Sequence, residues 1–184
     1  MKTMRTVSDL LRWERLLADD RQAALLSVEC PDKIAGRRVP ADLNGLTLEE
    51  IDRFWQCRTT RDLFLVTGRV LFGWSERRTL RADAYKMMGI VNRVTSELLR
   101  IAGLFEAIAS RPTAQEIMAG SESLDFGTFG LADWYALRMG LRSHDEAFST
   151  PWLRIYQCRA NDAAVAAFQR RLEDIRAREL KRKM

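Results

Sequence analysis

The single histidine of the chain is the residue whose chemistry is easiest to assess. His144 lies between Ser143 and the acidic pair Asp145 and Glu146. A protein metal site needs several converging ligands, and a lone histidine among charges is typical of a solvent-facing helix start. A general-base mechanism would depend on His144 alone. The sequence therefore predicts no metal site here.

Adjacent carboxylates are the second group that could do chemistry. Neighbouring residues on a helix point about 100° apart, so two adjacent carboxylates do not face one substrate. Such pairs more often serve as helix caps and surface charges. We assign no catalytic role to the four pairs, which are Asp19-Asp20, Glu49-Glu50, Asp145-Glu146 and Glu173-Asp174.

Three cysteines complete the inventory of reactive side chains. Cys30, Cys57 and Cys158 lie far apart, form no CxxC pair and have no histidine near them in sequence. An odd and sparse set of cysteines is typical of reduced thiols in the cytoplasm. We predict no catalytic residue, no cofactor and no enzymatic activity, with an enzyme as the third-ranked function class.

The size and composition of the chain favour one folded domain over residues 1–184. The chain has 184 residues, of which 47% are hydrophobic and 30% charged. These values exclude collagen-like and disordered classes. The N-terminus lacks the apolar stretch of a signal peptide, and the longest apolar run covers only residues 163–168. We therefore expect a cytoplasmic protein without a membrane span.

Apolar spacing and capping residues predict an all-α fold, a single-domain irregular helical bundle. The longest pattern of three- and four-residue steps runs from Thr79 to Ser110 and predicts one long central helix. Gly89 and Gly103 lie inside it and indicate either close helix packing or a bend.

Capping signals place the shorter helices around that long one. Ser8, Thr60 and Ser75 are expected at helix starts, and a short helix is expected over Arg21 to Val28. Gly73 and Gly140 are expected at helix ends. Capping boxes are expected at Thr47 with Glu50, Thr113 with Glu116, and Ser143 with Glu146.

Two segments interrupt the helical pattern. Residues 30–44 contain prolines, a glycine and charges, which predicts an irregular loop pinned to the core by Val39 and Leu43. Residues 124–130 interleave apolar side chains with two glycines, which predicts a tight, packed turn. This turn lacks the spacing of a phosphate-binding loop.

Aromatic residues supply the candidate partner-binding surface. Trp74 follows Gly73 outside any periodic stripe, and tryptophan is enriched at binding hot spots. Trp134, Phe148 and Trp152 cluster in sequence between the long helix and the C-terminal one. We predict that these four residues contact a protein partner, while core packing remains the alternative for each.

Residues 124–148 resemble the later part of bacteriophage tail assembly chaperones. The resemblance is carried by Phe126 to Phe148, with Met139-Gly140-Leu141 as a helix exit and Asp145-Glu146-Ala147-Phe148 as an acidic pair followed by an aromatic residue. The family has no catalytic residues. The resemblance implies a phage or prophage protein that binds the tape-measure protein in the host cytoplasm without cofactors.

The basic C-terminal helix, predicted over residues 162–184, supports the alternative function. Of the net charge of +5, residues 141–184 contribute +4, from 10 basic and 6 acidic side chains. Such an end can contact nucleic-acid phosphates, although basic residues also favour a helix C-terminus for its dipole. The candidate phosphate contacts are Arg170, Arg171, Arg178, Lys181, Arg182 and Lys183.

Overall fold

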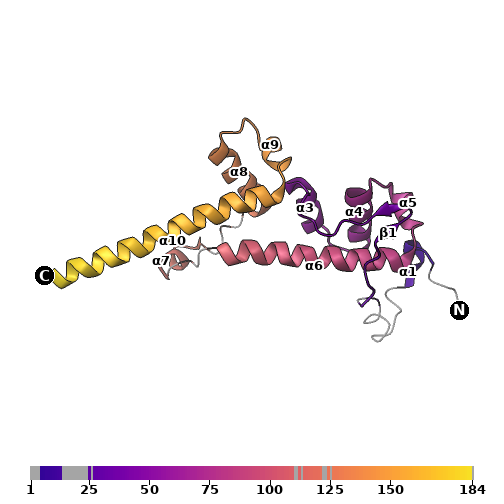
Figure 1. Ribbon diagram of the computed structural model, residues 1–184, viewed down its shortest axis with the longest axis horizontal. Coiled ribbons are helices and arrows are strands. Elements are labelled where there is room, and N and C mark those ends of the chain that lie inside the picture. Colours follow the sequence, from indigo (N-terminus) through magenta and orange to yellow (C-terminus); the bar gives the residue numbers. More distant parts are fainter. Residues whose placement is uncertain are drawn as a thin grey trace. The chain divides into compact units, whose positions relative to one another are not determined.

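The computed structural model describes residues 5–13, 25, 27–109, 112, 114–121, 124 and 126–183 (Figure 1). Within these residues the chain is predominantly helical, with one pair of very short strands, so the predicted all-α class is confirmed. The elements are α1 (Val7–Trp13), β1 (Lys33–Ile34), β2 (Arg37–Arg38), α3 (Leu48–Trp55), α4 (Thr60–Phe72), α5 (Glu76–Leu80), α6 (Ala84–Ile108), α7 (Ala114–Met118), α8 (Gly127–Met139), α9 (His144–Phe148) and α10 (Trp152–Lys183).

The chain divides into two compact units, where the sequence predicts one domain. The N-terminal unit is Met1–Ile101 and the C-terminal unit is Ala102–Met184. The division falls inside α6, of which Ala84 to Ile101, about five turns, belong to the N-terminal unit. Each unit has buried apolar side chains of its own, including Phe64 in the first and Trp152 in the second.

Side-chain caps begin most helices of the N-terminal unit. The predicted capping box of Thr47 with Glu50 is present, and Ser75 accepts from the backbone N–H of Arg78 as expected. Helix α4 begins at Thr60 as predicted, with Thr59 as its cap in a capping box with Asp62. The first helix differs from the prediction, because Thr6, and not Ser8, exchanges hydrogen bonds with Asp9.

The segment 30–44 contains a small hairpin that the sequence analysis missed. β1 and β2 pair antiparallel, with Lys33 opposite Arg38. The turn uses Ala35 and Gly36, both at positive φ. No alternation of hydrophobic residues marks this hairpin in the sequence, so only the local backbone geometry reveals it. The rest of the segment is irregular, and Val39 and Leu43 are buried as predicted.

The long central helix begins later than predicted. Thr79 and Leu80 belong to α5, and the chain turns at residues 81–83 before α6 starts at Ala84. Asp83 accepts from the backbone N–H of Lys86, which caps the new helix. Two glycines of α6 differ in their surroundings. A Cβ at Gly89 would lie 2.1 Å from the carbonyl oxygen of Glu29, so Gly89 marks close packing, whereas a Cβ at Gly103 meets nothing within 4 Å.

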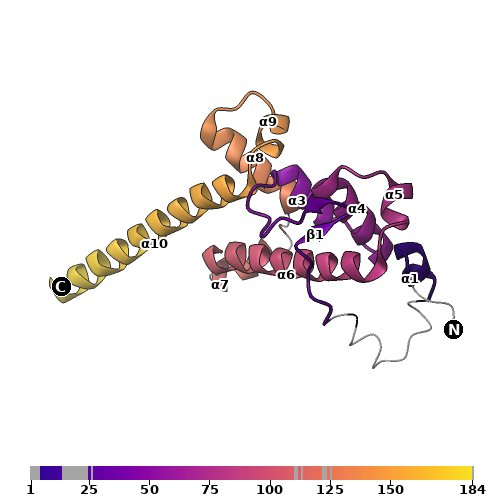
Figure 2. The same cartoon turned by 45° about the vertical axis from the view of Figure 1, so that its right-hand side comes forward.

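The C-terminal unit is built around the start of α10. Trp152 and Ile155 are fully buried, and Phe105 at the end of α6 packs against Trp152 and Tyr156 at centroid distances of 6.3 and 5.4 Å. In two views α8 and α9 lie against the N-terminal part of α10, while its C-terminal part extends away from them (Figures 1 and 2). α10 therefore contains the predicted basic helix of residues 162–184 and begins ten residues earlier.

Two expectations fall on residues outside those that the structure describes. The helix expected over Arg21 to Val28 lies mostly in the segment 14–24 and residue 26, and the capping box at Thr113 includes an undescribed residue. At Ser143, the hydroxyl accepts from the backbone N–H of Glu146, which is one half of the expected capping box.

Candidate protein-binding surface

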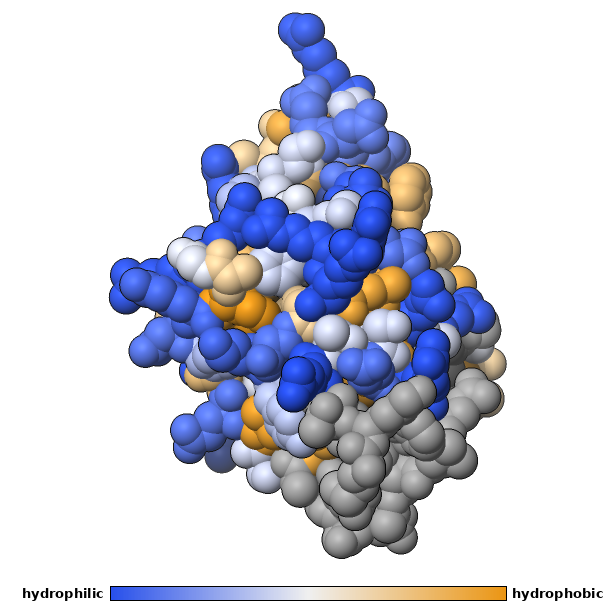
Figure 3. Space-filling model, turned by 90° about the vertical axis from the view of Figure 1, so that its right-hand side faces the viewer, coloured by the Kyte–Doolittle hydropathy of each residue, from blue (hydrophilic) through white to orange (hydrophobic). Residues whose placement is uncertain are grey.

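Exposed apolar side chains concentrate in the C-terminal unit. Among the described residues, three large hydrophobic side chains with high exposure lie in the N-terminal unit and eleven in the C-terminal unit. The surface drawn in Figure 3 is mostly hydrophilic, with small hydrophobic patches separated by polar residues. A broader apolar area is therefore to be sought in the C-terminal unit.

Helix α8 carries the most compact group of these side chains. Phe126, Phe129 and Leu137 are 69%, 58% and 77% exposed. Phe126 is the N-cap of α8. Steps of three, four and four residues lead from Phe126 to Phe129, Asp133 and Leu137. These four side chains therefore share one side of the helix. We call Phe126, Phe129 and Leu137 the α8 face.

Two glycines shape the beginning of α8. Gly127 has φ +51°, a conformation in which other residues are strained. A Cβ at Gly130 would lie 2.5 Å from the Cβ of Phe126, so only glycine lets Phe126 sit against the first turn. The turn is tight as predicted, but Leu124, Phe126 and Phe129 are exposed instead of packed.

His144 joins α9 to the α8 face. Its ring lies 4.8 Å from the ring of Phe129, and its Nε2 is 2.9 Å from Oδ1 of Asp133. The side chain of His144 is 44% exposed at the first position of α9, in keeping with the solvent-facing helix start that the sequence indicates. The contacts hold one edge of Phe129 while most of its surface stays exposed.

The opposite side of α8 faces α10. Arg138 forms two hydrogen bonds with Asp162, and the guanidinium groups of Arg138 and Arg159 lie 5.9 and 5.0 Å from the ring centroid of Trp134. Trp134 is therefore half-buried between two cations. This arrangement fixes α8 and leaves the α8 face outward.

The four aromatic residues predicted to contact a partner do not form one surface. Trp152 is 0% exposed and Trp74 is 4% exposed, so neither offers a contact surface in this structure. Trp152 is the centre of the C-terminal core, and Trp74, which follows the left-handed Gly73, packs against Phe72 with ring centroids 4.8 Å apart. Trp134 and Phe148 are half-buried within the C-terminal unit.

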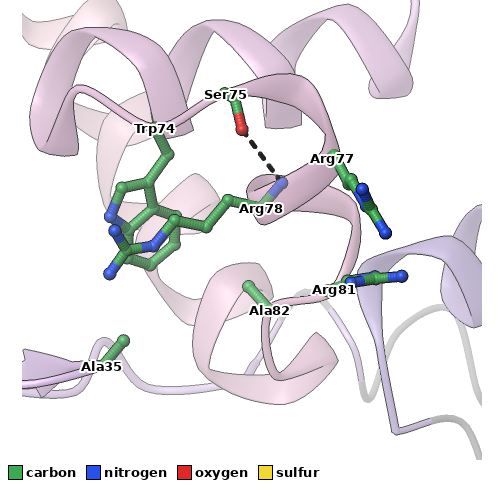
Figure 4. Close-up of a pocket in the computed structure, with 7 residues that line it drawn as sticks. All are labelled: Ala35, Trp74, Ser75, Arg77, Arg78, Arg81 and Ala82. Atoms are coloured by element: carbon green, nitrogen blue, oxygen red, sulfur yellow. Dashed lines mark hydrogen bonds between the residues drawn. The ribbon is translucent and has the colours of Figure 1, made fainter.

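Trp74 lies at the base of an open pocket of about 560 Å³ in the N-terminal unit (Figure 4). The guanidinium of Arg78 lies 5.0 Å from the indole centroid, and the indole Nε1 has no hydrogen-bond partner among the described residues. Arg77 and Arg81 also line the pocket but point to the other side of α5. The three cations thus do not converge on one ligand position.

The basic residues proposed for phosphate contact are all on α10. Arg170, Arg171, Arg178, Lys181 and Arg182 are exposed, while the side chain of Lys183 lies outside the described residues. None of those five forms an ion pair within the described part of the chain. They remain available to an anionic partner.

Reactive groups give no catalytic arrangement in the described part of the chain. No three histidine, cysteine or acidic side chains of that part are close enough to hold a metal ion. Burial raises the pKa of the thiols of Cys30 and Cys57, which lowers the fraction of reactive thiolate. No described helix is both long and apolar enough to span a bilayer.

Comparison with known proteins finds no protein family that matches the chain, and no similar curated protein or solved structure.

Proposed function

We propose that this protein acts by binding another protein through the α8 face. The observation that carries the proposal is the exposure of Phe126, Phe129 and Leu137 on one side of α8, a helix that Arg138 links to α10 through Asp162. Exposed apolar side chains gathered on one side of a helix typically mark an interaction site, and here Asp133 lies between Phe129 and Leu137. Burying it against an apolar partner would remove three large side chains from water.

The specific form that we propose is a bacteriophage tail assembly chaperone that binds the tape-measure protein in the host cytoplasm. The resemblance of residues 124–148 to that family supports this form, because the segment includes the whole α8 face. A chaperone of this kind needs an apolar surface for a helical client and needs no catalytic residues.

Co-expression with the proteins encoded next to its own gene tests the proposal. We expect the wild-type chain to retain one of them, a tape-measure protein, in a pull-down. The double variant Phe129→Asp, Leu137→Asp should fold and lose this client, since two buried carboxylates would need desolvation. Phe148→Asp probes the half-buried aromatic residue at the end of α9.

A matched control comes from the N-terminal unit. Leu99 is 69% exposed on α6, so Leu99→Asp places one carboxylate on a similarly exposed leucine outside the α8 face. It should retain the client. If no adjacent gene product is retained, or if the double variant retains it as well as the wild type, the proposal is wrong.

Nucleic-acid binding is the second candidate function, and one observation favours it. With about 100° per helical residue, Arg170, Arg171, Arg178, Lys181 and Arg182 fall within about 120° around α10. Asp174 lies inside the same arc, and its negative charge weakens the attraction of the arc for phosphates. If this arc binds phosphates, deleting residues 181–184 should reduce the slope of log affinity against log salt by about 0.9 for each lost contact. Under the leading proposal, binding to DNA stays weak and disappears at physiological salt.

A further inference from the structure

The C-terminal part of α10 is largely uncovered by the described residues. From residue 164 to residue 182, the part that carries the side chains discussed below, every described side chain is exposed except those of Ala167 and Leu172, which are half-exposed. Most helices in proteins owe their stability to the packing of an apolar face, and this segment has no such packing in the described structure. An exposed apolar surface on this part of α10 therefore needs an explanation.

That surface is a narrow apolar seam. Val165, Phe168, Leu172 and Ile175 follow one another at steps of three, four and three residues, the spacing of core positions in a coiled coil. Val165, Phe168 and Ile175 are 56%, 58% and 53% exposed. Asn161 and Glu179 occupy the next positions of the same repeat and end the seam on both sides. We call Val165, Phe168, Leu172 and Ile175 the α10 seam.

Arginines flank the α10 seam on both sides. Arg171 and Arg178 lie next to it on one side and Arg176 on the other, given about 100° per residue. In coiled coils these flanking positions select the partner by charge. The flanks carry positive charge on both sides, which complements negative charge on both flanks of a partner helix.

We propose that the α10 seam binds an acidic amphipathic helix of a partner protein. The inference concerns a surface separate from the α8 face and does not depend on the proposed function. A second copy of this chain fits poorly, because a parallel pair would place Arg171 of each helix against Arg176 of the other, and an antiparallel pair would also oppose arginines. A seam of only these core positions is also narrower than the apolar face with which a helix lies on a membrane.

Two synthetic helices test the proposal with the full chain. One has leucine at every core position and glutamate at every flanking position, and its control has lysine in place of each glutamate. Fluorescence anisotropy of labelled peptide should show binding of the acidic helix that weakens as salt rises, and no binding of the basic helix. Phe168→Asp should weaken binding at least about tenfold, the loss expected at a central apolar contact.

The matched control is on the same helix. Leu180 is 66% exposed but points about 100° away from the middle of the seam, so Leu180→Asp should leave the affinity unchanged. Equal loss with Leu180→Asp, or equal binding of both peptides, would overturn the proposal. Dimerisation of the chain that Phe168→Asp abolishes would also overturn it, and so would binding to phosphatidylserine vesicles or DNA without binding to the acidic helix. The double variant Phe129→Asp, Leu137→Asp should bind the acidic helix normally. The proposal for the α10 seam can therefore be tested even if the proposal for the α8 face is wrong.

Discussion

Arg138 on α8 holds both carboxylate oxygens of Asp162 on α10, with Nε–Oδ2 and Nη2–Oδ1 distances of 2.9 and 3.0 Å. The two residues are 24 positions apart in sequence, and their pairing joins α8 to α10 within the C-terminal unit. On the same helix Phe129 and Leu137 are exposed.

The pKa of Asp162 reports on this pairing. Hydrogen bonding by Arg138, more than its charge alone, holds the pKa of the Asp162 carboxyl below its ordinary value. We expect Arg138→Ala to raise that pKa toward the ordinary aspartate range, as followed by NMR of the carboxyl carbon through an acid titration. An unchanged pKa in the variant would mean that the two side chains do not pair in solution.

Two glycines of the same helix should respond oppositely to alanine. Gly103→Ala should stabilise the protein by about 0.5–1 kcal/mol, because alanine favours helix and a Cβ there meets open space. Gly89→Ala should destabilise it by about 1–3 kcal/mol, because the new Cβ collides with the backbone at Glu29. Urea unfolding measures both changes. A stabilising Gly89→Ala would show that residue 29 does not pack against α6.

Thr67 on α4 is a buried residue whose hydroxyl has no hydrogen-bond partner among the described residues. Valine has nearly the same shape and removes the unpaired oxygen. We expect Thr67→Val to leave stability unchanged or to raise it by about 1 kcal/mol. Thermal unfolding followed by circular dichroism tests this, and a clear loss of stability would reveal a hydrogen bond that Thr67 makes in solution.

Glu97 makes the N-terminal unit sensitive to acid. Hydrogen bonds from Arg100 and from the backbone N–H of Leu43 lower its pKa in the folded state. A folded carboxyl with a lowered pKa stabilises the protein above the pKa of the unfolded chain, and this contribution is lost as the pH falls through the lowered value. Glu97→Gln should therefore be less stable than wild type at neutral pH, with a difference that shrinks below about pH 4. A constant difference across the titration would contradict this assignment.

Local signals in the sequence predict much of the fold. Thr47 with Glu50 and the glycines 73 and 140 act within one helical turn, so helix starts and ends follow from short-range chemistry. The late start of α6 was missed because the apolar spacing continues through the turn at residues 81–83, where Asp83 caps a new helix.

The binding surface was harder to predict, because periodicity shows which residues share a face but not which face is covered. Trp152 is covered by Phe105, a residue 47 positions earlier, and that contact has no signature in sequence. Trp74 is buried next to Phe72 and Arg78. Phe126 and Phe129 lie in the segment expected to form a packed turn, and both are exposed in the folded chain.

Site-specific photo-crosslinking tests the central claim, that the α8 face binds a client protein. A benzoyl-phenylalanine at position 129 and, separately, at position 99 would be irradiated during co-expression with the proteins encoded beside the gene. The account predicts an adduct with one defined protein, the tape-measure protein, from position 129 and none from position 99. No adduct at position 129, or equal adducts from both positions, would contradict it.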